Sequence, residues 1–337
     1  MNKIGFACKW IDRPDQVNGI KPKDDCKQYN TGSTTVAWLN RQSRDVAEQK
    51  LWDLMEQNIN STYKLVERVG GLEENLRMVR LSSDILPVYT ESSWRYFWRD
   101  SRVREACAEG FARIGEIARK NNIRLSMHPG QFTVLASDNP EIVERSIEEF
   151  EYHVDMARWM GYGKSFQDFK INVHISGRQG PQGIVHALQR LTPEARNCLT
   201  IENEENAWGL DSTLELSKHC ALVLDIHHHW CREGEYIQPT DDRVLRVIDS
   251  WRGVRPVIHY SYSRANYVGH IDNELPNMSL LLEQGFKKQK LRAYSDFYPN
   301  HAVNKWALAH SAWADIMCES KAKNLASFEL AKQAKLI

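Results

Sequence analysis

Short apolar runs alternate along the chain with longer stretches in which apolar residues recur every three or four positions. The short runs predict eight strands, at residues 3–8, 78–82, 123–128, 169–175, 198–202, 221–225, 256–261 and 291–296. The longer patterns predict amphipathic helices over 43–69, 101–120, 140–160, 211–219, 241–251 and 273–285, and a last helix from about residue 300. Strands that alternate with helices of this length indicate βα units and a parallel sheet.

Eight such units predict an α/β protein, a (β/α)8 TIM barrel built as a single domain. The chain has 337 residues, of which 42% are hydrophobic and 26% charged, which is ordinary globular composition. No internal repeat, low-complexity tract or Pro/Gly-rich linker divides it. We expect the barrel over residues 1–306, and a C-terminal helical tail over 307–337 that is part of the barrel or packed on it.

Charge and cysteine content narrow the class of protein only slightly. Lys and Arg number 44, as do Asp and Glu, so the bulk charge neither supports nor excludes a nucleic-acid partner. The seven cysteines form no CxxC pair, which is typical of reduced thiols in a cytoplasmic protein. Neither a signal peptide nor a run of about 18 apolar residues is present. We therefore expect a cytoplasmic location and no membrane partner.

Residues that can bind metals cluster at the ends of the predicted strands. Six successive strands, the third to the eighth, end in or near a His, Asp or Glu, and in a closed barrel these ends meet at one mouth. Mixed imidazole and carboxylate ligands suit zinc, manganese or iron, and the lack of cysteine disfavours a structural zinc site. The candidate ligands are His128, His174, Glu202, Asp225, His228, His259, His270 and Asp296.

Each candidate also has an ordinary structural explanation. Asp225 could simply cap the next helix, and of residues 227–229, all histidines, at most two can point inward. Glu202 is the stronger case, because a carboxylate at the end of an apolar strand is costly to bury without a partner. The coincidence over six strands favours a metal site. Two or three ions around a hydroxide suit phosphodiester hydrolysis, but sugar isomerases use the same barrel and ligand types, and the spacing does not decide between them.

Four segments resemble the UV damage endonuclease family, which shares its barrel superfamily with endonuclease IV and xylose isomerase. They are LSMHPGQF at 125–132, VHISG at 173–177, IENE at 201–204 and LDIHH at 224–228, and the resemblance covers roughly residues 3 to 296. It implies an enzyme that nicks damaged double-stranded DNA immediately 5′ of cyclobutane pyrimidine dimers and 6-4 photoproducts, and of abasic sites, leaving a 3′-hydroxyl and a 5′-phosphate. It also implies a monomer, associated with the nucleoid during repair, and three divalent ions. Manganese is favoured, with zinc, cobalt or magnesium as alternatives.

The resemblance also implies roles for individual residues. By position, the seven candidates from His128 to His270 match family ligands, although His270 depends on an alignment across a gap. The residues assigned to catalysis are Glu202, His128, Asp225 and His259. Two departures stand out. Many members end the last strand in a Glu followed by a Lys-rich stretch, where we expect Asp296, and many carry a Lys where this chain has Val257.

Family members probe the duplex with a pair of residues after the HPG turn, and here these are Gln131 and Phe132. A photodimer pairs poorly and is therefore easier to extrude than normal bases, and an amide with an aromatic wedge could fill the space left behind. The alternative is that Phe132 is a buried loop anchor. Phe6 and Trp10 lie in the family's other DNA-facing loop and are candidates for contact with the opposite strand.

Two other functions remain open from the sequence. One is a metal-dependent sugar isomerase-like or other small-molecule barrel enzyme, which would have no use for Gln131 or Phe132. The other is a DNA-binding barrel that has lost catalysis, which the full set of candidate ligands argues against.

Overall fold

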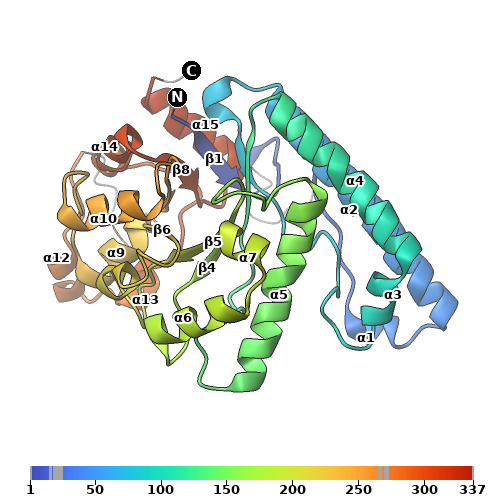
Figure 1. Cartoon of the computed structure of the whole chain (residues 1–337). Coiled ribbons are helices and arrows are strands. Elements are labelled where there is room, and N and C mark those ends of the chain that lie inside the picture. Colours follow the sequence, from blue (N-terminus) through green and yellow to red (C-terminus); the bar gives the residue numbers. More distant parts are fainter. Residues whose placement is uncertain (1, 15–16, 18–25, 265–267, 269–272, 336–337) are drawn as a thin grey trace.

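Eight parallel strands and the helices between them form the barrel (Figure 1). The computed structural model describes residues 2–14, 17, 26–264, 268 and 273–335. The strands are β1 (Ile4–Ala7), β2 (Met78–Arg80), β3 (Arg124–Met127), β4 (Lys170–His174), β5 (Leu199–Glu202), β6 (Ala221–Val223), β7 (Val257–Tyr260) and β8 (Asp315–Cys318). Their order is β6-β5-β4-β3-β2-β1-β8-β7, and a bridge between Asp225 and His259 joins the two ends of the sheet. The predicted (β/α)8 barrel is confirmed.

The helices begin and end near the residues that the apolar spacing predicts. Asn139 caps α5 through Glu141 N, with Pro140 in the first turn, and Asp100 caps α4. The helices are α1 (Val36–Leu39), α2 (Arg44–Gly70), α3 (Arg95–Arg99), α4 (Ser101–Lys120), α5 (Pro140–Trp159), α6 (Gly180–Arg190), α7 (Pro193–Cys198), α8 (Leu210–Leu214), α9 (Ile226–Glu233), α10 (Asp242–Ser250), α12 (Met278–Glu283), α13 (Lys288–Leu291), α14 (His301–Ala309) and α15 (Lys323–Gln333). Over the described residues, none of them is long and apolar enough to cross a membrane.

The eighth strand lies at Asp315–Cys318, so the strand expected at 291–296 is wrong. Residues 288–291 form the short helix α13, and Tyr294 makes only an isolated antiparallel bridge to Ser263. The true strand pairs with β1 on one side and β7 on the other, which places it inside the barrel wall. The segment 307–337, expected to be a helical tail, therefore supplies β8 and α15.

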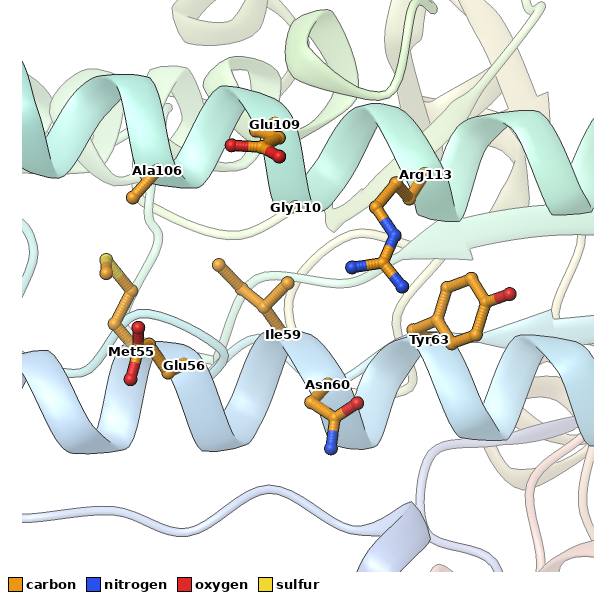
Figure 2. A pocket seen from close by; sticks show the side chains of 9 residues that line it. All are labelled: Met55, Glu56, Ile59, Asn60, Tyr63, Ala106, Glu109, Gly110 and Arg113. Atoms are coloured by element: carbon orange, nitrogen blue, oxygen red, sulfur yellow. The ribbon is translucent and has the colours of Figure 1, made fainter.

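Helices α2 and α4 lie side by side and extend away from the strands (Figure 1). A groove of about 260 Å³ runs between them, and Figure 2 shows Ile59 and Tyr63 of α2 facing Gly110 and Arg113 of α4 across it. The Arg113 guanidinium lies 5.0 Å from the centre of the Tyr63 ring. A Cβ at position 110 would come within 2.6 Å of Ile59, so glycine is what allows this close approach. The groove contains none of the candidate ligands.

Candidate metal centre

Acidic and imidazole side chains converge at the mouth formed by the carboxyl ends of the strands. Because all eight strands are parallel, the ends of β3 to β8 face the same side of the barrel. Each of these six strands contributes one side chain from its last residues or from the residues that follow it. These side chains belong to His128, His174, Glu202, Asp225, His259 and Glu319.

Glu202 lies at the centre of this group and is fully buried. Its Oε2 is 3.4 Å from His128 Nε2 and 3.7 Å from His174 Nε2. Its Oε1 is 3.1 Å from His259 Nδ1 and 3.5 Å from His228 Nδ1. Burial alone would raise the pKa of Glu202, but the surrounding histidines, His259 foremost, outweigh burial and hold it well below its usual value. One ionised carboxylate therefore faces four imidazoles, as a bridging ligand would.

The two carboxylate oxygens of Asp225 differ, since one accepts hydrogen bonds and the other accepts none among the described residues. Its Oδ1 caps α9 by accepting hydrogen bonds from His227 N at 2.8 Å and His228 N at 2.7 Å. Its Oδ2 is buried and has no hydrogen-bond partner among the described residues. Burial raises the pKa of this carboxyl well above its usual value, and the charges of Glu202 and Glu319 add to the rise, while the nearby His228 offsets only part of it. A bound metal ion would satisfy this buried carboxylate oxygen, which lies 3.6 Å from His228 Nδ1 but accepts no hydrogen bond.

The side chains form three overlapping groups that could each hold an ion. Within each group the ligand atoms lie no more than 4.8 Å apart, and the groups are His128–His174–Glu202, Glu202–Asp225–His228 and Asp225–His259–Glu319. Glu202 and Asp225 each belong to two groups. Burial lowers the pKa of His128, His174 and His259, which favours the neutral imidazole that binds metals. The donor set thus fits divalent ions held by nitrogen and shared carboxylate oxygens.

Glu319 is a candidate ligand that the sequence analysis did not predict. It follows β8 directly, forms an ion pair with Arg80, and lies with its Oε1 3.5 Å from His259 Nδ1. Asp296 belongs to none of the three groups, and its backbone oxygen accepts a hydrogen bond from Ala322 N. The last strand therefore does not depart from the family pattern as expected. A Glu follows it directly, and Lys321 comes two residues later. The buried apolar residues just before Glu319 were the signal that could have found it.

The structure describes the three consecutive histidines at 227–229 but not the distant His270. Of the three consecutive histidines only His228 belongs to a group, since His227 Nε2 lies 3.5 Å from Cys231 Sγ and His229 Nε2 lies 3.1 Å from Glu235. His270 lies outside the described residues. His228 was the one chosen from the sequence.

A buried lysine also lies beside the metal-binding groups. Lys170 Nζ of β4 is 3.0 Å from His259 Nε2, and burial lowers the pKa of this lysine to about 7. Val257, where many family members carry a lysine, is buried within the barrel. The chain therefore brings a lysine to His259 from a different strand, and the apolar run around position 170 gave no sign of which way it points.

The loop after β3 presents an exposed aromatic residue at the same mouth. Phe132 is 85% exposed, and Gln131 beside it is also exposed. Gln131 helps line a cavity of about 220 Å³ that reaches His174, His228 and Tyr294. The reading of Phe132 as a buried anchor is thus wrong.

Phe6 and Trp10 do not face solvent, which corrects their expected contact with DNA. Phe6 is fully buried, and only 4% of Trp10 is exposed. The ring of Trp10 packs edge-on against Phe6 and Phe328, and the Arg68 guanidinium lies over it at 4.5 Å. Both aromatic residues therefore belong to the core.

Several known proteins are similar to this chain. The family model described as UV-endonuclease UvdE matches residues 15–337. A UV DNA damage endonuclease of Bacillus cereus (strain B4264) is 24% identical over 327 residues, covering 91% of this chain and 89% of that protein. One from Bacillus mycoides (strain KBAB4) is 25% identical over 325 residues, with the same coverage. The crystal structure of SacUVDE matches with a TM-score of 0.73 at 21% identity, covering 100% of this chain and 99% of the other, which supports the fold.

Proposed function

Because this chain belongs to the UV-endonuclease UvdE family, we propose that it is a metal-dependent DNA repair endonuclease. It cuts the phosphodiester backbone of double-stranded DNA immediately 5′ of cyclobutane pyrimidine dimers and 6-4 photoproducts, and also at abasic sites. The products carry a 3′-hydroxyl and a 5′-phosphate. The observation that carries this proposal is the placement of six strand-end ligands and an exposed Phe132 at one mouth of the barrel.

The buried side chains of the site would hold the divalent ions. Divalent ions bound here would supply an activated water and positive charge for the phosphate. His128, Glu202, Asp225 and His259 would hold them. Asp225 is itself fixed by Asn203, which accepts from its backbone N–H at 2.8 Å and donates to its backbone oxygen at 3.1 Å. These two hydrogen bonds hold the ends of β5 and β6 together, so the candidate ligands are positioned before DNA binds.

We further propose three manganese ions as the native complement, with zinc, cobalt or magnesium as alternatives, because two carboxylates are each shared between two groups. The enzyme would act as a monomer in the cytoplasm, on nucleoid DNA. Metal analysis of protein purified without chelators tests the identity and number of the ions, and the mass of the protein in solution tests the monomer.

The direct test of the function uses a duplex oligonucleotide that carries one thymine dimer. With Mn²⁺ present, we expect a single nick at the phosphate immediately 5′ of the dimer, and we expect EDTA to abolish it. The same duplex without the dimer is the control. Equal cutting of both duplexes would remove the lesion specificity. No cutting of either, combined with a melting temperature raised by a sugar, would favour the small-molecule alternative.

Replacement of Phe132 by alanine is expected to weaken binding to dimer-containing duplex without loss of stability. Stacking of an aromatic side chain on a base contributes about 1–3 kcal/mol, so we expect about 5- to 150-fold weaker binding. Phe132 is 85% exposed, so few core contacts are lost. Binding to a labelled dimer duplex in Ca²⁺ or EDTA measures the effect. Tyr96→Ala, which removes an exposed aromatic ring from α3, is the control, and equal affinities for both variants would contradict the probe role.

A further inference from the structure

Two lysines lie at the rim of the same mouth, where strands β1 and β8 end. Lys9 follows β1 by two residues, and Lys323 is the first residue of α15, the helix after β8. The two strands are parallel neighbours, with Phe6 paired to Cys318, so they end at the same level of the barrel. Among the described residues, neither ammonium group makes a hydrogen bond or an ion pair.

Hydrogen bonds hold the two segments that carry these lysines against each other. The Asn324 side chain accepts from Ile11 N at 2.9 Å and donates to Ile11 O at 2.9 Å. Helix α15 also packs on β1 (Figure 1). Both lysines have a left-handed backbone, with φ of 80° at Lys9 and 51° at Lys323, which residues other than glycine seldom adopt. The fold therefore sets the positions of the two lysine backbones relative to each other.

The surroundings of Lys323 favour a bound anion. Its side chain is half-buried, and burial lowers the pKa of its ammonium group. The nearby charges of Arg80 and Lys9 lower this pKa further, and those of Cys8 and Glu319 offset only part of the drop. Glu319 is already paired with Arg80, so a positive charge remains at this part of the rim. The first turn of α15 has no acidic residue to neutralise it.

We propose that Lys9 and Lys323 together bind one backbone phosphate of the DNA close to the cut. The proposal rests on the proposed function, because its ligand is DNA. Lysine ammonium groups bind phosphates as point charges. The ion pair of Arg80 with Glu319 connects this part of the rim to the group of Asp225, His259 and Glu319, so the phosphate lies near the metal-binding groups without being part of them.

The two lysines and Phe132 contact the DNA at separate points of the mouth. The loop that carries Phe132 follows β3, and the sheet order places β2 between β3 and β1. The lysines should therefore strengthen binding to any duplex, damaged or not, because a phosphate contact carries no information about the bases. Phe132 should matter most for the duplex that contains the lesion.

The test measures the salt dependence of DNA binding by the double variant Lys9→Asn/Lys323→Asn, in EDTA. Each phosphate that a protein neutralises contributes about −0.9 to the slope of log affinity against log salt concentration. We expect the slope of the variant to be shallower by about 0.9, with the same loss of affinity for dimer-containing and undamaged duplex. Asparagine adopts the left-handed backbone more readily than lysine, so the melting temperature should not fall.

The matched control is Lys335→Asn at the other end of α15. Lys335 is also an exposed lysine with a left-handed backbone, with φ of 54°. A series of duplexes, each with one neutral methylphosphonate near the cut, locates the contact. At one position the methylphosphonate should weaken binding by the wild type but not by the double variant. If the double variant folds poorly, Lys9→Glu at an exposed position should still make the slope shallower.

Two results would overturn the proposal while leaving the nuclease standing. One is an unchanged slope in the double variant of a protein that nicks the dimer duplex, and the other is a loss of affinity for the dimer duplex alone. A shallower slope, combined with no nicking by the wild type, would refute the nuclease and leave the phosphate site. A wild-type protein that binds neither duplex would refute both.

Discussion

Substitution of Glu202 by glutamine is expected to lower the rate of nicking by about 1,000-fold or more, because loss of several kcal/mol of metal-derived stabilisation corresponds to about tenfold for each 1.4 kcal/mol. The shape of the side chain is retained, so the effect comes from the charge and from the donor atoms. Glu202 is the only one of the carboxylates described at this site that meets four imidazoles, with contacts between 3.1 and 3.7 Å.

The neutral amide would also place an NH2 group against metal-binding nitrogens. Either His128 and His174 or His228 and His259 would face a donor where they now face an acceptor, because the two carboxylate oxygens serve the two pairs separately. Asn172, whose amide already donates to Glu202 Oε2, leaves little freedom for the new amide to rotate. Bound metal should therefore fall together with activity.

Initial rates on UV-irradiated plasmid and metal content per chain measure both effects. Glu194→Gln is a suitable control, since it alters a surface glutamate paired with Arg158, on the outer helix α7. A Glu202→Gln enzyme that cuts within a few fold of the wild type would show that this carboxylate is not a shared ligand. Unchanged metal content with a large loss of rate would instead place Glu202 in the chemistry alone.

The sequence pattern predicts most of this site because strand ends in a barrel have a fixed direction. Any residue that ends a parallel strand faces the same mouth, so His174, Glu202 and Asp225 could be brought together without knowledge of the packing. Glu319 was missed because its strand is short and begins with a charged residue, Asp315, where the apolar pattern is interrupted. The pairing of that strand with β1 and β7 establishes it as part of the barrel.

Exposure of single side chains was harder to predict, since it depends on distant segments. Trp10 is covered by Phe328 of α15, more than 300 residues away, and by Tyr29 and Arg68. No local pattern around Trp10 contains that information. Phe132, in contrast, follows a polar turn and is 85% exposed in the part of the chain that the structure describes. The two aromatic residues looked alike in the sequence, but Trp10 is buried and Phe132 is exposed.

Asp315→Asn is expected to lower the free energy of unfolding by about 3 kcal/mol, the lower end of the 3–5 kcal/mol range for breaking a buried ion pair. Asp315 is buried at the start of β8, opposite the mouth. Its Oδ2 accepts from Arg124 Nη1 at 2.7 Å, and its Oδ1 accepts from Arg255 Nε at 2.7 Å and from Lys3 N at 2.9 Å. We take the lower end because both arginines keep some exposure to water.

The Asp315→Asn substitution is expected to lower stability without changing the nicking rate of the folded protein. Asparagine leaves two guanidinium groups facing a neutral amide, which offers them a single oxygen and puts an NH2 donor where the second oxygen was. Urea unfolding followed by circular dichroism measures the loss, with the exposed Asp249→Asn on α10 as the control. Asp315 belongs to none of the three metal-binding groups, so the nicking rate of the folded protein well below the transition should match the wild type. An unchanged urea midpoint would mean that the pairing with β1 and β7, and not this carboxylate, holds the last strand in the barrel.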